Sequence, residues 1–416
     1  MKIKIRLIIM NLFQYAIWGA WLISLGGYLG GKLNYTGVQI GSFFATMGIA
    51  SLVMPAIMGI IADRWVNAEK VLAISHLISG TFMFVAAGQT EYHMLYTFIL
   101  LAVLFYMPTI ALSNSVAYNA LAKHNLDPIK HFPPVRIFGT IGFIVSMILV
   151  DLIKIDGVAL SKSANQLYFS AIISFALGLY SFTLPKCDIN KNPDKSSLVD
   201  MLGLRAFTLF KEKRMAVFFI FSMLLGVALQ ITNAFANLYL TDYFGNMPEY
   251  ADSFGVRHAN ILISISQMSE TLCILLIPFF LRRYGIKNVM LMSMIAWVLR
   301  FALLGTGNPG DGVWMLILSM IIYGFAFDFF NISGSLYVET ETHPSIRSSA
   351  QGVFMIMTNG FGALIGSYAA GKVVDVVGWP NSWFVFAAYA LVVFFLFWIL
   401  FDYKHEPEKI SQSLQK

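Results

Sequence analysis

The sequence predicts an all-α integral membrane protein with twelve membrane-spanning helices in two six-helix bundles, and three observations lead to this fold class. Of the 416 residues, 58% are apolar and only 12% are charged, whereas soluble domains have roughly 45–50% apolar and about 25% charged residues. Apolar stretches long enough to cross a hydrocarbon core about 30 Å thick recur along the chain. The longest polar interval, 185–213, separates six such stretches from six.

Each predicted span has about 20 residues, the length that a helix needs to cross the core. In the first half the spans are 7–30, 38–62, 71–89, 93–121, 135–153 and 165–184. In the second half they are 214–241, 258–281, 288–305, 313–338, 349–376 and 381–402. The predicted organisation is an N-terminal bundle at 1–184, a cytoplasmic linker at 185–213, a C-terminal bundle at 214–402 and a cytoplasmic tail at 403–416.

Positive charge predicts the orientation, because Lys and Arg accumulate in cytoplasmic loops. With both termini inside, most basic residues fall on the inner side. The outer side keeps only Lys32, Lys154, Lys162, Arg257 and Lys372. Loop bias therefore explains the net charge of +6 without a nucleic-acid partner. Arg300 falls inside a predicted span, near its outer end, and we interpret it as an interfacial residue.

Polar side chains recur on one face of four predicted spans. Ionisable groups at bilayer depth are costly, so those that stay there are candidates for function. Residues three, four or seven apart share a helix face, and such a face would be unstable against lipid, so we expect these faces to line one cavity. The sets are Arg136, Thr140 and Phe143; Gln230, Asn233 and Asn237; Gln267 and Glu270; and Tyr323, Phe327, Asp328 and Asn331.

Several stretches are similar to conserved blocks of a known family. Residues 132–143, with the letters FPPVRIFGTIGF, 218–226 with 230–233, and 327–335 carry the similarity. They resemble helices 5, 7 and 10 of the bacterial nucleoside/H⁺ symporters of the major facilitator superfamily, and the resemblance runs over nearly the whole chain.

The loop after the second predicted span resembles the signature loop of the same superfamily. It reads Gly59-x-x-x-Asp63-Arg64, but Trp65-Val66-Asn67 stand where Gly-Arg-Arg is typical. We interpret Asp63 and Arg64 as a gate or structural ion-pair element and not as part of the substrate site.

The resemblance implies a function and a set of site residues. The expected function is proton-coupled import of nucleosides across the bacterial inner membrane by alternating access, in a monomer without cofactor or metal. Amides and carboxylates suit ribose hydroxyls and base edges, and aromatic rings can stack on the base. Glu270 and Asp328 are the expected proton carriers. The residues matching the family's nucleoside site are Arg136, Thr140, Phe143, Gln230, Asn233, Gln267, Glu270, Tyr323, Phe327 and Asp328.

Several alternatives stay open at this point. A sugar symporter or an uncoupled facilitator of the same superfamily would have the same fold. Arg136 could extend to the cytoplasmic interface, and Gln230 and Asn233 could only connect helices. Glu270 or Asp328 could pair with an Arg in the bundle, and Phe143 and Phe327 could be plain packing residues.

Two other classes of protein fit the sequence less well. A membrane enzyme is disfavoured because the seven His are scattered and no zinc-protease, serine-hydrolase or phosphate-binding motif occurs. The two cysteines, Cys187 and Cys273, are far apart and form no metal motif. A sensor would need a larger soluble domain than 185–213 and 403–416 provide.

Overall fold

A computed structural model describes residues 2–187, 204–343 and 346–403 of the chain. Its contacts divide the chain into two compact units, which we describe separately. Unit 1 comprises Met1–Tyr35 and Ser42–Ser196, and unit 2 comprises Thr36–Gly41 and Ser197–Lys416. Much of the predicted linker and tail, 188–203 and 404–416, lies outside the described residues, and the predicted bundle boundaries stay a prediction.

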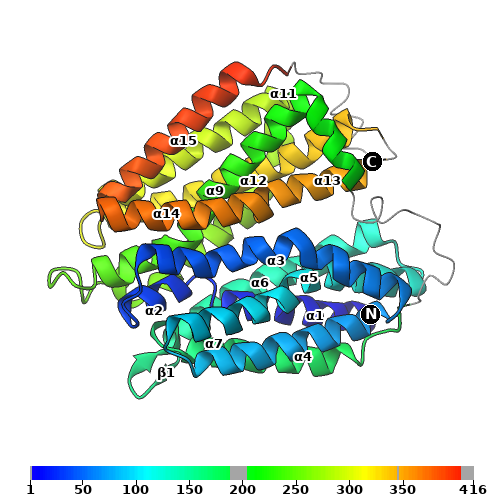
Figure 1. The fold of residues 1–416 in the computed structure, drawn as a ribbon, viewed down its shortest axis with the longest axis horizontal. Coiled ribbons are helices and arrows are strands. Elements are labelled where there is room, and N and C mark those ends of the chain that lie inside the picture. Colours follow the sequence, from blue (N-terminus) through cyan, green and yellow to red (C-terminus); the bar gives the residue numbers. More distant parts are fainter. Residues whose placement is uncertain (1, 188–203, 344–345, 404–416) are drawn as a thin grey trace. The chain divides into compact units, whose positions relative to one another are not determined.

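Unit 1 is built from long helices (Figure 1). Within it α1 packs against α6, and α4 packs against both α5 and α7. Its helices, with α3 beginning in the segment assigned to unit 2, are α1 (Lys2–Gly19), α2 (Leu25–Gly31), α3 (Gly37–Arg64), α4 (Ala68–Ala87), α5 (Tyr92–Lys123), α6 (Pro128–Leu152), η1 (Leu160–Lys162) and α7 (Asn165–Ser181).

A short hairpin follows α6 in unit 1. Strands β1 (Lys154–Ile155) and β2 (Val158–Ala159) pair antiparallel. The two residues between them, Asp156 and Gly157, have φ of 51° and 80°. An Asp-Gly pair with positive φ at both positions is typical of the tight turn that matches the twist of a hairpin.

Unit 2 contains α11, in which two helices meet at the non-helical residue Gly285, and two π-helical turns, η3 and η5. Helix α11 packs against α12 and α15, and α9 packs against η5 and α14. Its elements are η2 (Leu204–Lys211), α9 (Lys213–Leu238), η3 (Tyr239–Tyr243), α10 (Phe254–Arg257), α11 (Ala259–Thr306), α12 (Val313–Glu341), α13 (Arg347–Met355), η5 (Ile356–Gly362), α14 (Ala363–Val377) and α15 (Asn381–Leu400).

All twelve predicted spans fall on helices, with one difference in detail. The first predicted span is interrupted, because α1 ends at Gly19 and α2 begins at Leu25. The spans 258–281 and 288–305 are the two helices of α11, which are separated at Gly285, where φ is 78° and the backbone is not helical. Among the described residues, nine helices are long and apolar enough to cross a membrane. That number counts α11 once and omits α1 and the 17-residue α7.

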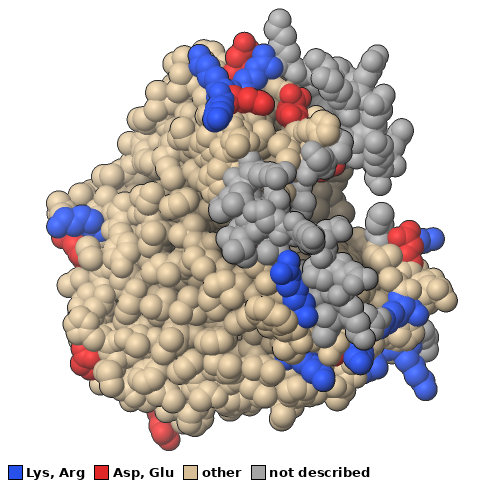
Figure 2. Space-filling view, turned by 45° about the vertical axis from the view of Figure 1, so that its right-hand side comes forward, with Lys and Arg blue, Asp and Glu red and all other residues tan. Residues whose placement is uncertain are grey.

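The surface is suited to contact with lipid. Large apolar side chains are exposed on many helices, among them Ile172, Leu275 and Trp398. Figure 2 shows wide areas of the visible face without a charged side chain. Lipid can cover such areas, whereas water-soluble monomers rarely expose large contiguous apolar patches.

Glycines bring α1 and α6 into direct contact in unit 1. A Cβ on Gly19 would lie 2.3 Å from the carbonyl oxygen of Phe143, and one on Gly142 would lie 2.1 Å from that of Leu12. Small residues allow membrane helices to approach this closely. The contact fixes the part of α6 that carries Thr140 and Phe143.

Candidate functional site

An aromatic cluster in unit 2 is centred on Tyr323 of α12. The ring of Phe327 stacks on it with centroids 5.8 Å apart and an interplanar angle of 6°. Trp297 of α11 meets the Tyr323 ring edge-on at 6.0 Å and 90°. The guanidinium carbon of Arg300 lies 4.7 Å from the centre of the same ring. Tyr323 and Phe327 therefore present one stacked aromatic pair, with Trp297 and Arg300 against the tyrosine.

Polar groups from α11 and α12 surround the same tyrosine. The Gln267 side chain is a neighbour of the Tyr323 hydroxyl, and Glu270 and Asp328 both interact electrostatically with Tyr323. The two carboxyl groups also interact with each other. Asp328 is 4% exposed, and its Oδ2 has no hydrogen-bond partner among the described residues. The structure thus brings together the five predicted site residues of α11 and α12.

The polar residues of α9 differ in their contacts. Asn237 donates from Nδ2 to Oδ1 of Asn260 at 2.7 Å, which links α9 to α11. Gln230 is buried, but within the described part of the chain its Oε1 has no hydrogen-bond partner. Asn233 is half-buried. A buried acceptor without a partner costs about 1–3 kcal/mol, so Gln230 is a better candidate for ligand binding than for helix packing.

The predicted site residues of α6 meet aromatic rings of α1. The guanidinium carbon of Arg136 lies 3.8 Å from the centre of the Tyr15 ring, and half-buried Thr140 follows one turn later. Phe143 contacts Trp18 edge-on, with centroids 6.4 Å apart at 84°. Arg136 therefore packs on an aromatic face of α1, which disfavours the alternative that it only extends to the interface.

Trp18, which contacts Phe143, also packs against Tyr106, and a chain of buried hydrogen bonds begins at that tyrosine. The Trp18 and Tyr106 rings lie 6.0 Å apart, and the Tyr106 hydroxyl donates to the Gln14 carbonyl at 2.7 Å. Gln14 Nε2 donates to Thr109 Oγ1 at 2.7 Å, while its Oε1 lies 2.8 Å from Nε2 of His76. This chain fixes the tyrosine relative to α1.

The interpretation of Arg300 as an interfacial residue is wrong. Its side chain is fully buried in unit 2. Its Nη1 donates to the Ser319 carbonyl at 2.6 Å, and no carboxylate is among its hydrogen-bond partners in the described residues. The sequence did contain a signal for a buried role, because an ionisable group inside a membrane helix is costly and is therefore a candidate for function.

Three aromatic residues that contact predicted site residues had no comparable signal in the sequence. Tyr15, Trp18 and Trp297 stand in apolar runs where aromatic residues are frequent. Their contacts with Arg136, Phe143 and Tyr323 become visible only in the packed helices.

The remaining predicted elements are described in part. Arg64 is the last residue of α3, whereas the Asp63 side chain lies outside the described residues, so the gate at this loop stays a prediction. Among the residues that the structure describes, no three His, Cys, Asp or Glu side chains gather in a way that could hold a metal ion.

Comparison with known proteins gives consistent results over the full chain. A family model described as "Nucleoside H+ symporter" matches residues 1–406. The xanthosine permease of Escherichia coli (strain K12) is 50% identical over 418 residues, which cover 99% of each chain. The nucleoside permease NupG of the same organism is 48% identical over 412 residues, 97% of each chain.

A solved structure confirms the predicted fold. The crystal structure of the nucleoside transporter NupG matches with a TM-score of 0.90 at 48% identity, and the match covers 97% of this chain and 100% of that one. The protein is thus a multi-pass membrane transporter with the major facilitator fold. From the family model and these relatives, we conclude that the chain belongs to the nucleoside H⁺ symporter family.

Proposed function

We propose that this symporter imports nucleosides across the bacterial inner membrane by alternating access, with both termini in the cytoplasm. In this proposal the ten residues expected from the sequence bind the nucleoside, and Glu270 and Asp328 carry the proton. The observation that carries the proposal is the cluster around Tyr323, where a stacked aromatic pair adjoins an amide and two carboxyl groups.

The cluster suits both parts of a nucleoside. The ring of Phe327 is half-buried and stacked on Tyr323, so a planar base can extend the stack. Vicinal ribose hydroxyls need acceptors and donors, which carboxylates and carboxamides provide. Glu270, Asp328 and Gln267 offer these groups next to the rings. A plain packing role for Phe327 would not require polar groups there.

The same carboxyl groups can couple the proton to the substrate. Two neighbouring carboxylates repel each other, and an apolar environment increases this repulsion. A proton on one of them removes the repulsion, and the protonated carboxyl becomes a hydrogen-bond donor for a ribose oxygen. Proton binding and nucleoside binding would then favour each other, which is the requirement for symport.

The α6 residues are proposed to supply cationic and aromatic contacts. Arg136 is pre-oriented by the Tyr15 ring, so little side-chain entropy is lost when its remaining donors bind a nucleoside oxygen. Phe143 is held by Trp18 and by the close approach of α1. The excess of Lys and Arg in the predicted inner loops supports the orientation.

The test is uptake of labelled nucleosides into proteoliposomes with and without an inward proton gradient. The proposal predicts concentrative uptake that a protonophore abolishes, together with alkalinisation outside the vesicles when nucleoside is added. Uptake that only equilibrates and moves no protons would show a facilitator. Uptake of sugars in place of nucleosides would contradict the substrate class.

A further inference from the structure

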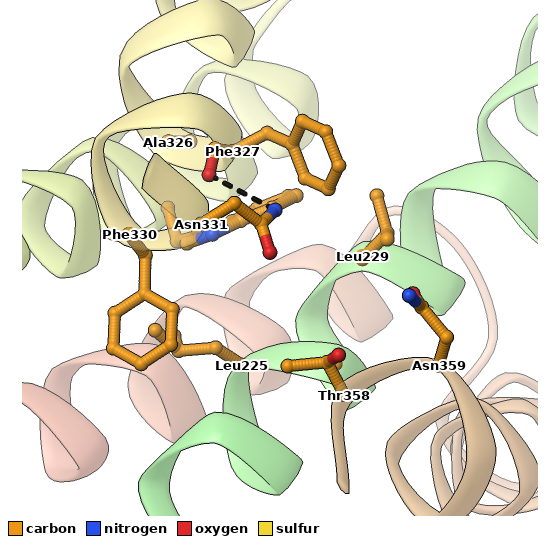
Figure 3. A pocket seen from close by; sticks show the side chains of 10 residues that line it. Leu225, Leu229, Ala326, Phe327, Phe330, Asn331, Thr358 and Asn359 are labelled. Carbon is orange, nitrogen blue, oxygen red and sulfur yellow. Dashed lines mark hydrogen bonds between the residues drawn. The ribbon is translucent and has the colours of Figure 1, made fainter. Parts of the chain in front are cut away.

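A small cavity lies inside unit 2, between α9, α11, α12 and η5. Its volume of about 20 Å³ is enough for one water-sized group. Its walls are mainly apolar and aromatic, and its polar lining consists of Asn331, Thr358 and Asn359. Figure 3 shows the carboxamides of the two asparagines entering the space from different sides, one from α12 and the other from η5.

The hydrogen bonds of Asn331 define which of its atoms is left for a ligand. Its Nδ2 donates to the carbonyl of Phe327 at 3.3 Å (Figure 3). A carbonyl oxygen only accepts, so the nitrogen must be on that side. The Oδ1 atom is the group left over, and it makes no hydrogen bond within the described residues. Asn331 therefore offers the cavity an acceptor that lacks a donor.

The other two polar residues differ from Asn331. The Thr358 hydroxyl already donates to the carbonyl of Phe354 at 3.0 Å. Among the described residues, Asn359 has only a weak contact from Nδ2 to the Met355 sulfur at 3.8 Å. No strong partner from the described part of the chain fixes its amide, so it can turn either its oxygen or its nitrogen to the cavity. The cavity is thus lined by the fixed acceptor Oδ1 of Asn331 on one side and by the adaptable amide of Asn359 on the other.

The backbone of η5 presents Asn359 to this space. The segment Ile356–Gly362 forms a π-helical turn, and such turns are frequent at functional sites. A Cβ on Gly226 of α9 would lie 2.1 Å from the carbonyl oxygen of Thr358, so α9 and η5 are in backbone contact. This contact leaves little freedom to the turn that carries Asn359.

The cavity adjoins the Tyr323 cluster. Phe327 and Trp297 line the cavity, and both also contact the Tyr323 ring. Along α12, Asn331 follows Asp328 by three residues, and hence on the same side of the helix. A ligand that stacks on Phe327 with its sugar at Asp328 can therefore reach Asn331 with an edge of its base.

We propose that Asn331 accepts a hydrogen bond from an N–H group on the base edge of the transported nucleoside and that Asn359 adapts to the neighbouring base atom. This inference rests on the proposed function and adds to it the determinant of base selectivity. The apolar walls suit an aromatic edge, and a fixed oxygen acceptor requires a donor such as an exocyclic amino group or a ring N–H. Asn331 is half-buried, and a bound base that lacks this donor would cover Oδ1 without pairing it.

The experiment compares ligands that differ in one donor, using the full-length protein in proteoliposomes. Adenosine is compared with purine riboside, which lacks the amino group, and uridine with 3-methyluridine, whose ring N–H is blocked. In at least one pair, the parent protein is expected to prefer the nucleoside that carries the donor by about fivefold or more, as expected when the other nucleoside covers an acceptor without pairing it. In Asn331→Leu this preference should fall to about one.

Two further variants make the result specific. Asn359→Leu should alter affinity while part of the preference remains, because its amide is adaptable. Asn288→Leu is the matched control, since Asn288 Nδ2 also donates to the carbonyl four residues earlier, at 2.9 Å, but at an exposed site of α11. The control should keep both affinity and preference. Thermal unfolding in detergent shows whether each variant is folded.

The outcomes separate this inference from the proposed function. If the parent transports nucleosides but Asn331→Leu keeps the parent's preference, the cavity holds a water or nothing and the inference is wrong. If the parent binds no nucleoside, the proposed function itself fails. A folded Asn331→Leu variant whose affinity falls by the same factor for the nucleoside with the donor and for the nucleoside without it would also contradict a contact with the N–H group.

Discussion

The guanidinium group of Arg300 lies over the ring of Tyr323, with its carbon 4.7 Å from the ring centre. The same group donates to the Ser319 carbonyl at 2.6 Å. Arg300 is fully buried, and in the described part of the chain no carboxylate is hydrogen-bonded to it. Its position therefore connects a costly buried cation with the tyrosine that Gln267, Glu270 and Asp328 surround.

We expect Arg300→Met to weaken nucleoside binding without lowering thermal stability. The cation–π contact that holds Tyr323 is worth about 2 kcal/mol, so the loss of this pre-organisation lowers affinity by at most roughly 30-fold. Removing a buried charge also removes its desolvation cost, which protects the fold. Calorimetric titration and thermal unfolding measure the two effects. Arg300→Lys should restore binding only in part, and parent-like affinity in Arg300→Met would refute the positioning role.

Gln230→Leu is expected to raise thermal stability while it weakens nucleoside binding by about 1–3 kcal/mol, or 5- to 150-fold. The buried Oε1 of Gln230 has no partner among the described residues, so an apolar side chain removes a cost to the folded protein. The ligand loses its hydrogen bond. Unfolding curves and calorimetry on one preparation give both values.

A matched control on the same helix is Asn237→Leu. Asn237 is hydrogen-bonded to Asn260, so this variant should lose stability and keep its affinity for nucleoside. If Gln230→Leu behaves like Asn237→Leu, Gln230 is a packing residue, and its assignment to the site is wrong.

Cys187 is expected to react slowly with maleimide at neutral pH. Burial, followed by the neighbouring Glu69 carboxylate, raises the pKa of its thiol from 9.0 to about 11. The reactive thiolate is the minor form below this pKa, so the labelling rate should rise about tenfold per pH unit up to pH 11. The measurement is the mass shift over time in a Cys273→Ser background. Labelling at the rate of an exposed thiol at pH 7 would contradict this environment.

The slow reaction depends on contacts between α4 and the residues after α7. The Cys187 amide donates to Glu69 Oε2 at 2.9 Å, and Asn67 Nδ2 donates to the Cys187 carbonyl at 2.5 Å. We expect Glu69→Ala to accelerate labelling, because it removes both the backbone anchor and a negative charge near the thiol. An exposed change such as Asn119→Ala should leave the rate unaltered.

Hydrophobicity was sufficient to predict the helices, because each span is a continuous apolar run whose length the bilayer sets. It could not predict local backbone geometry. The interruption after Gly19 and the π-helical turn around Asn359 leave no gap in the apolar pattern. The sharp bend between two spans at Gly285 likewise depends on one residue's backbone conformation.

Side-chain chemistry allowed part of the site to be predicted. Gln267 and Glu270 share a helix face by spacing alone, and the structure places them with Asp328 around Tyr323. Arg300 shows the limit of this reasoning. Its position near a predicted helix end favoured an interfacial role, whereas the packing of α11 against α12 buries it.

The central claim is that Glu270 and Asp328 couple the proton to nucleoside transport, and their amide variants test it most directly. Glu270→Gln and Asp328→Asn keep the shape of each side chain but hold no transportable proton. A gradient drives the cycle only through its differential effect on the access states, so each coupling variant should lose accumulation. Exchange of nucleoside down its own gradient should survive wherever the amide replaces the carboxyl's hydrogen bonds.

The measurement is gradient-driven accumulation alongside counterflow, in proteoliposomes containing each variant separately. We predict that at least one of the two variants retains counterflow and loses accumulation under an inward proton gradient. Arg300→Met provides a comparison in which binding is weakened but both carboxyl groups remain, so accumulation should return at high nucleoside concentration. If both amide variants accumulate nucleoside as well as the parent, neither residue carries the proton and the account is wrong.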